Sequence, residues 1–565
     1  MSRIISRSKY YYLLIAGIGV AASASTSGMY LLYTSIWNPI LSILKIVSWY
    51  YFLFAFIALA ASYAIVKVFA DTKSTGSGTH LLLEKYHLSN GELSVNDTVA
   101  KTFASIFTLG FGGSAGPEGP SLLIGGGIAS NVSRHLGVRV HNIKRIFIAG
   151  AAAGLTAVFR TPLTGILFAL EIPYRNDLDM ETFIEAMVAS IPSYLIAVLI
   201  LGSERIFGNP IQSQISLNEI VLSMVLGLIC GAYAIFFTKI FSSADRLRSS
   251  VRKKAGSIGL IALGTVLLGV IGYFSIYSIG VGTHFMEAII SGTSFTVAML
   301  LAIILLKTLA TAITLNFGGS GGLFFPTIIV GAGIGLLFSN LTRELNLIGV
   351  NFSIMFVAVG MAALLSGTHK ILLTPVAFVV ETLGGTYAIP ALLASGVSYL
   401  VSGNASFYPI QPRTRMKAEE LALEKFYAKA RVSIPEQLKG TFAESFMTKQ
   451  PVLMHDSATV KEALEVFEKT RFRVLPVVDD HQRVVGTVTL EDLGNIDPRK
   501  MEEHLSERLM HKPLTINEHT SLGETADMMI RREEDHVFVV DENEHITGVV
   551  AGIDVVRKMM ELSTT

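Results

Sequence analysis

Apolar segments recur along most of the chain, from residues 11–33 through 388–402, about a dozen in all. Several are shorter than the ~20 residues that a membrane-spanning helix needs, or are broken by glycine and proline. Broken helices of this kind surround midplane binding sites in membrane transporters. The pattern therefore predicts an all-α polytopic membrane domain over residues 1–410, embedded in a lipid bilayer.

Two pairs of matching segments indicate that this membrane domain is duplicated. Residues 112–128 (GGSAGPEGPSLLIGGGI) match 318–334 (GGSGGLFFPTIIVGAGI) at an offset of 206, with 8 of 17 positions identical. Residues 163–171 (LTGILFALE) match 373–381 (LTPVAFVVE) at an offset of 210. Two matches in the same order predict two structural repeats. Identity alone leaves open whether the repeats are parallel or inverted.

The rest of the chain alternates between short β-branched strands and helices, and it is duplicated as well. Five residues recur at an offset of 62: Pro451, Val477, Val478, Gly486 and Asp492 reappear as Pro513, Val539, Val540, Gly548 and Asp554. This repeat predicts two like α/β modules, at residues 441–500 and 501–565. Residues 411–440 form a charged, predicted helical connector.

Charge follows the same division. Residues 411–565 carry 21 basic and 28 acidic side chains, whereas residues 1–410 carry 24 and 16. The tail is therefore predicted to be water-soluble and acidic, and the basic excess of the membrane part suits positively charged cytoplasmic loops. The formal net charge of +1 gives no indication of nucleic-acid binding. The single cysteine, Cys230, is expected to be a buried, inert thiol.

In both glycine-rich segments a flexible loop leads into an apolar helix. The first turn of a helix leaves backbone N–H groups without partners, and inside a membrane those donors must be satisfied. A dehydrated anion can satisfy them with the help of the helix dipole. Two such helix starts predict an anion site without a buried lysine or arginine, because a full counter-charge would hold the ion too tightly for release.

Glu118 is the ionisable residue in the first of these loops. Burial of a charge in a membrane is costly, so an intramembrane carboxylate indicates function. When ionised it can occupy the anion site as a tethered anion, and when protonated it can leave. Proton binding and anion binding would then be linked.

Other readings of the loops fit less well. A phosphate-binding P-loop ends in Gly-Lys-Ser/Thr, which neither loop has. A magnesium channel needs carboxylate and water ligands, whereas these loops offer N–H donors. No nucleophile–base pair or metal-ligand set indicates an enzyme, and transport needs no cofactor.

At these residues the chain resembles the CLC family of chloride channels and chloride/proton antiporters. Four family motifs appear in order: Gly76 to His80 (GSGTH, with His80 in place of the family's proline), Gly116 to Pro120 (GPEGP), Gly322 to Pro326 (GLFFP), and Tyr408 near the end of the membrane part. The resemblance implies inverted repeats, at about residues 30–205 and 214–402. It also implies a homodimer in the cell membrane with both termini cytoplasmic.

The resemblance further implies roles for individual residues. Glu118 takes the place of the gating, proton-carrying glutamate. The central chloride is expected to be held by the hydroxyls of Ser77 and Tyr408 and by the backbone N–H groups of Leu323 and Phe324. All of these are neutral donors.

One departure bears on mechanism. Antiporters of the family commonly have a second, internal glutamate, and that position is Ile172 here. The neighbouring Glu171 has a repeat mate in Glu381, which indicates a shared structural role rather than proton relay. A chloride/proton antiporter is the favoured interpretation, and a nucleotide-gated passive chloride channel is the alternative.

The tail resembles a pair of CBS modules, which commonly bind adenine nucleotides. Module one has the Ser/Thr-x-x-Asp pattern at Thr489 to Asp492, and module two keeps only the acid, Asp554. The resemblance implies an ATP or AMP site formed by Pro451, Val452, Phe472 and Asp554, with Thr489 and Asp492 in a second cleft. An empty, purely structural pair remains the alternative.

Overall fold

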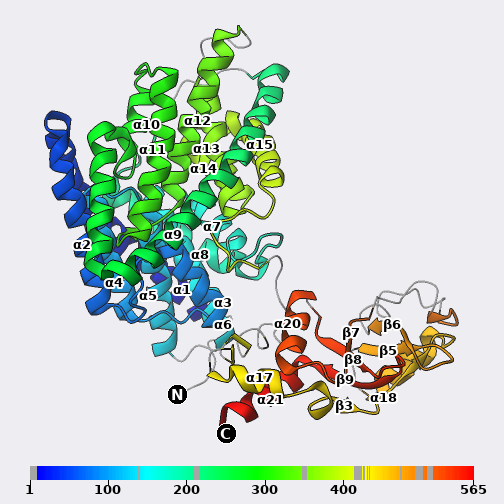
Figure 1. Cartoon of the computed structure of the whole chain (residues 1–565). Coiled ribbons are helices and arrows are strands. Elements are labelled where there is room, and N and C mark those ends of the chain that lie inside the picture. Colours follow the sequence, from blue (N-terminus) through cyan, green and yellow to red (C-terminus); the bar gives the residue numbers. More distant parts are fainter. Residues whose placement is uncertain are drawn as a thin grey trace. The chain divides into compact units, whose positions relative to one another are not determined.

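The computed structural model divides the chain into two compact units, residues 1–415 and 416–565 (Figure 1). It describes residues 9–136, 140–208, 215–346, 353–412, 423, 427–428, 430–431, 433–470, 474–489, 501–505, 513–532 and 534–564. Phe472 and Asp492, two of the expected nucleotide-binding residues, lie outside these ranges.

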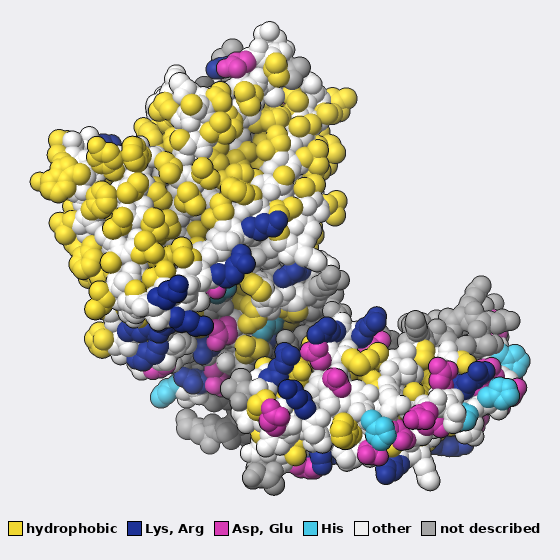
Figure 2. All heavy atoms as spheres, viewed as in Figure 1, with side chains coloured by type: hydrophobic (Ala, Val, Ile, Leu, Met, Phe, Trp, Pro, Cys, Tyr) yellow, Lys and Arg dark blue, Asp and Glu magenta, His cyan; other side chains and the backbone are white. Residues whose placement is uncertain are grey.

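The first unit is built from helices around a large apolar core. Six of its described helices are long and apolar enough to cross a membrane. They are α1 (Lys9–Ile46), α2 (Tyr51–Phe69), α8 (Phe183–Leu201), α9 (Leu217–Phe274), α11 (Val297–Asn316) and α12 (Phe324–Glu344). Helix α9 breaks at Gly256, where φ is +66°. Hydrophobic side chains cover the outside of these helices, and many Lys and Arg side chains gather toward one end of the unit (Figure 2).

The remaining helices carry the loops and caps that shape the interior. They are α3 (Gly78–Leu88), α4 (Val95–Gly110), α5 (Glu118–His135), α6 (Val140–Phe159), α7 (Pro162–Glu171), α10 (Thr283–Ile290), α13 (Ser353–His369), α14 (Leu373–Thr382) and α15 (Ala388–Val401). Two-residue strands β1 (Gly76–Ser77) and β2 (Ser320–Gly321) pair in parallel between the repeats. The predicted all-α fold with broken helices is confirmed.

Glycine lets equivalent helices approach closely in both repeats. A Cβ placed on Gly125 of α5 would lie 1.9 Å from the carbonyl oxygen of Gly150 on α6. A Cβ placed on Gly331 of α12 would lie 2.4 Å from the carbonyl oxygen of Gly360 on α13. Because no carbon atom fits at such distances, glycine is required at both crossings.

The repeats also cap one another. The Glu171 carboxylate, at the end of α7, accepts the backbone N–H groups of Leu372, Leu373 and Thr374 at 2.6–3.0 Å. The Glu381 carboxylate on α14 accepts those of Leu163 and Thr164, at 2.9 and 2.8 Å. Each glutamate thus satisfies the open N–H groups that begin the other's helix. The shared structural role expected for these two residues is present.

The second unit contains two like modules. The first has β4 (Met454–His455), α18 (Val460–Thr470), β5 (Val474–Val478) and β6 (Val484–Thr489). The second has β7 (Thr515–Asn517), α20 (Leu522–Arg532), β8 (His536–Val540), β9 (Ile546–Ala551) and α21 (Gly552–Thr564). In both, a parallel strand pair is followed by an antiparallel hairpin with a register shift at the same place, between Val477 and Val478 or between Val539 and Val540.

The modules exchange segments at their edges. Strand β3 (Thr448–Lys449), near the start of module one, pairs antiparallel with β9 of module two. The core of module two also contains described residues of the connector. Among them are Tyr427 and Leu438, and Leu438 belongs to α17 (Pro435–Gly440). Leu505, which follows module one, packs into the core of module one.

Candidate functional site

The candidate site lies where the two glycine-rich loops meet. Gly116 and Gly322 exchange backbone hydrogen bonds of 3.0 and 2.8 Å. The N–H of Ser114 donates to the Thr314 hydroxyl at 3.0 Å, and the N–H of Ser320 donates to the Thr108 hydroxyl at 3.0 Å. These reciprocal bonds hold the starts of α5 and α12 against each other at the centre of the unit.

Glu118 is the first residue of α5, and its side chain is fully buried. Its Oε1 accepts the backbone N–H of Phe324, the first residue of α12, at 2.6 Å. Its Oε2 has no hydrogen-bond partner among the described residues. A Cβ on Gly116 or Gly322 would lie 1.9 Å from a carboxylate oxygen, so both glycines make the space in which the carboxylate sits.

The other expected chloride ligands surround the same region. Ser77 ends β1 and is 8% exposed, and its hydroxyl is unpaired within the described chain. The Tyr408 hydroxyl is buried and makes no hydrogen bond of normal geometry to the described residues, although the Thr79 side chain lies beside it. Leu323 is the buried residue immediately before α12. The unpaired hydroxyls of Ser77 and Tyr408 are therefore both available as donors to a ligand.

A cavity of about 420 Å³ reaches this region from one side. Gly76, Ser77 and His80 line it together with Phe407 and Pro409, just before the chain leaves the membrane unit. Lys101 also lines it, and its Nζ donates to the backbone oxygen of Ser74. Lys101 is 3% exposed, so a buried lysine lies along this approach, whereas the expectation of a site without a buried lysine concerned the two helix starts and stays a prediction.

Two histidines that the motif analysis did not assign flank Tyr408. The rings of His80 and Tyr408 are edge to face with centroids 4.9 Å apart, and those of His369 and Tyr408 are 5.3 Å apart. His80 was visible in the sequence only as a departure from the family motif, and nothing in the sequence indicated His369.

Ile172 follows the last residue of α7 and is fully buried. Its backbone oxygen accepts the Gln411 side-chain amide at 2.8 Å. The neighbouring carboxylate, that of Glu171, is hydrogen-bonded to the start of α14.

The described part of the tail leaves the expected nucleotide ligands apart. Pro451 and Val452 leave β3 toward the beginning of its antiparallel partner β9, whereas Asp554 follows the end of β9. The Asp554 carboxylate accepts the backbone N–H of Ala551 at 3.1 Å and lies 3.4 Å from Arg557. Thr489 is the last residue of β6. The nucleotide site stays a prediction.

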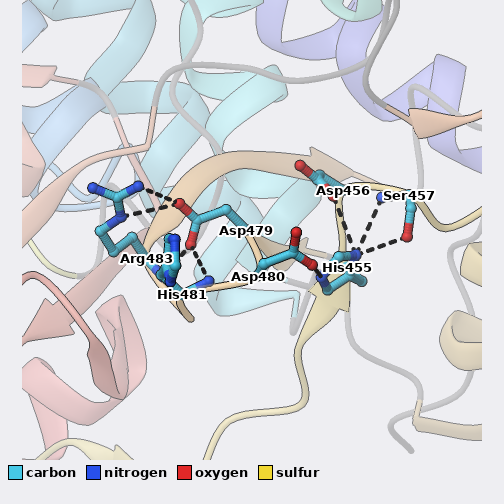
Figure 3. Close-up of polar contacts among 7 residues, drawn as sticks. All are labelled: His455, Asp456, Ser457, Asp479, Asp480, His481 and Arg483. Carbon is cyan, nitrogen blue, oxygen red and sulfur yellow. Dashed lines mark hydrogen bonds and ion pairs between the residues drawn. The ribbon is translucent and has the colours of Figure 1, made fainter.

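An exposed turn of module one gathers several acidic and histidine side chains (Figure 3). The Asp479 carboxylate accepts the backbone N–H groups of Arg483 and His481, which lower the pKa of that carboxyl below its usual value. Asp541 does the same in module two with His545 and Asn543. These contacts shape the β-hairpins. Among the residues that the structure describes, no group of three or more His, Cys, Asp or Glu side chains could hold a metal ion.

This arrangement of opposed helix starts, neutral donors and a buried carboxylate is that of an anion-transport membrane protein. The family model described as voltage gated chloride channel matches residues 55–403, and the CBS domain model matches residues 443–495 and 505–561. The chain belongs to the voltage gated chloride channel (CLC) family and carries a CBS pair. Members of this family are transporters and channels rather than enzymes.

Curated relatives cover much of the chain. An uncharacterized protein of Methanocaldococcus jannaschii is 28% identical over 329 residues, which are 57% of this chain and 79% of the relative. The chloride channel protein CLC-f of Arabidopsis thaliana is 27% identical over 444 residues, which are 70% of this chain and 56% of the relative.

Solved structures show the same fold. A CLC-type fluoride/proton antiporter superposes with a TM-score of 0.63 at 20% identity, covering 73% of this chain and all of that one. A slow cyanobacterial Cl⁻/H⁺ antiporter gives 0.61 at 19%, covering 69% and 94%. A eukaryotic CLC transporter gives 0.59 at 17%, covering 96% and 97%.

Proposed function

We propose that this protein exchanges chloride for protons across the membrane, with Glu118 as the residue that links the two ions. The supporting observation is the position of its carboxylate, bonded to the N–H that begins α12. A carboxylate at a helix N-terminus is the protein's own substitute for a bound anion.

In this mechanism the ionised carboxylate and chloride compete for one place. A proton neutralises Glu118 and weakens its bond to the Phe324 N–H, since a charge-assisted hydrogen bond becomes a neutral one. The side chain then leaves, and chloride is held by the N–H groups of Leu323 and Phe324 and by the hydroxyls of Ser77 and Tyr408. Return of the carboxylate expels the chloride and releases the proton.

The test is the potential at which net flux is zero in proteoliposomes under a chloride gradient at symmetric pH. Uphill proton movement driven by chloride supports exchange. A potential equal to the chloride Nernst value, with no proton movement, establishes passive flow and refutes the proposal.

A passive chloride channel is the second candidate, and the buried, apolar Ile172 favours it. A channel needs no route for protons, and the apolar side chain of Ile172 supplies no titratable group at this position. The zero-flux potential separates the two functions directly.

For the tail we propose regulation by an adenine nucleotide, ATP or AMP, bound with the help of Asp554. The supporting features are the match to two CBS domains and the position of Asp554 in the first turn of α21. Nucleotides are abundant in the cytoplasm, so both termini are proposed to face it. The protein is further proposed to be a homodimer of the cell membrane, which mass measurement in nanodiscs would test.

A further inference from the structure

His80 occupies an unusual place between water and the proposed anion site. It is the third residue of α3 and lines the 420 Å³ cavity together with Ser77. Its ring packs edge to face on Tyr408, with centroids 4.9 Å apart, and stacks near Phe241 on the other side. The ring therefore lies next to Tyr408, one proposed chloride ligand, and shares the cavity with Ser77, another.

The hydrogen bonds of His80 define which nitrogen carries the proton in the neutral ring. Its Nε2 lies 2.7 Å from the backbone oxygen of Phe407, and a carbonyl oxygen can only accept. The proton of the neutral ring is therefore on Nε2. Its Nδ1 is buried and has no partner among the described residues. A second proton can be added at Nδ1 without breaking any existing bond.

From this geometry we propose that His80 is a second proton-binding site, and that its protonation strengthens chloride binding at Ser77 and Tyr408. The inference rests on the proposed anion site but not on exchange by Glu118. A proton on Nδ1 puts a full positive charge beside the ion, and the ion in turn favours that charge. By linkage, chloride binding draws a proton onto His80.

The other charged groups around His80 do not take this role. The cavity is lined by two acids and two bases, namely Glu84 of α3, Lys101 of α4, and Asp245 and Arg248 of α9. Asp245 and Arg248 form an ion pair of 2.6 Å, and Lys101 bonds a backbone oxygen. Of the titratable groups that line the cavity, His80 is the one whose ring packs on Tyr408, so its charge is the one that changes directly beside the proposed anion site.

Two further groups face the same region from inside the unit. Glu118 titrates at the anion site itself, and it is removed from the test below by substitution. The ring of His369 also packs on Tyr408, but His369 is fully buried and does not line the cavity. Its Nδ1 lies 2.9 Å from the Thr368 hydroxyl. His369 thus has the same chemistry as His80 without access to the cavity, which makes it a matched control.

The inference also gives this chain a proton acceptor that Ile172 cannot provide. His80 faces the cavity together with Phe407 and Pro409, near the end of the membrane unit. A proton that enters the cavity meets His80 next to Tyr408 and Ser77.

The experiment is calorimetric titration of chloride into the full chain in detergent, at pH 4.5 and at pH 8, in a Glu118→Gln background. With the glutamate unable to titrate, chloride should bind about 10-fold more tightly at pH 4.5. Adding His80→Gln, whose amide can still donate to the Phe407 oxygen, should abolish that difference and leave the affinity at pH 8 within about 2-fold. Adding His369→Gln should leave the difference intact.

Three results would overturn the inference: no pH dependence in the Glu118→Gln protein, an unchanged pH dependence after His80→Gln, or a loss produced only by His369→Gln. If His80→Gln fails to fold, His80→Pro serves instead, because a helix does not use the N–H of its third residue. If the inference about His80 fails, the proposed exchange through Glu118 is unaffected, because exchange is tested by proton flux and not by chloride binding.

Discussion

Glu118 and Phe324 occupy equivalent positions in the two repeats, and the carboxylate of the first accepts the backbone N–H of the second at 2.6 Å. The two repeats thus present two opposed helix starts, and only the first residue of the pair is acidic. The Glu118 side chain therefore places a titratable carboxylate in the space between the two loops.

The first prediction concerns the titration of this group. In Glu118→Gln the amide oxygen can still accept the Phe324 N–H, but the side chain cannot exchange protons. Proton flux should fall to background while chloride flux persists, when both ions are recorded together from proteoliposomes. Glu381→Gln is the control, because Glu381 caps α7 outside the site, and it should retain coupling. Undiminished proton flux in Glu118→Gln would remove Glu118 from the mechanism.

The second prediction concerns the space that holds the carboxylate. A Cβ at Gly116 or Gly322 would lie 1.9 Å from a carboxylate oxygen, so Gly116→Ala and Gly322→Ala should drive the Glu118 side chain out. Chloride flux should then lose its dependence on pH, because the tethered anion no longer competes. Gly396→Ala is the matched control, since nothing lies within 4 Å of its Cβ. A normal pH profile in both site variants would show that the carboxylate does not gate.

The sequence predicted the loops of the site because they follow a local rule: glycine before an apolar helix, twice, at one offset. It could not predict the packing of His80 and His369 on Tyr408. These residues come from three segments far apart in the chain, and only the tertiary fold joins them. The exchange of β3 into module two was missed for the same reason, because strand pairing between modules leaves no periodic signal. Lys101 was missed because its partner, the backbone oxygen of Ser74, belongs to a separate segment that only the tertiary fold brings to α4.

The third prediction concerns the reciprocal caps. Glu171→Ala removes the acceptor of three backbone N–H groups and the Thr374 hydroxyl, and should lower the free energy of unfolding by about 2–4 kcal/mol. Glu381→Ala should cost less, because that side chain is more exposed and bonds two N–H groups and one hydroxyl. Thermal unfolding in detergent gives the ranking. Glu171→Gln, which keeps an acceptor, should recover part of the loss and leave the ratio of chloride to proton flux unchanged.

The last prediction concerns Asp554, which lies in the first turn of α21 and accepts the Ala551 N–H at 3.1 Å. If the carboxylate also accepts the hydroxyls of a ribose, Asp554→Ala should weaken ATP or AMP binding to the full chain by roughly 10- to 100-fold, as expected for a lost charged hydrogen bond. The same change also removes a helix cap worth ~1 kcal/mol, so a second variant is needed. Asp554→Asn keeps an oxygen for the cap and loses only the charge. Calorimetry on both variants separates the effects: binding should weaken in each, while the unfolding temperature of the tail falls mainly in the alanine variant. An asparagine variant with unchanged affinity would mean that the charge of Asp554 serves α21 and not a nucleotide.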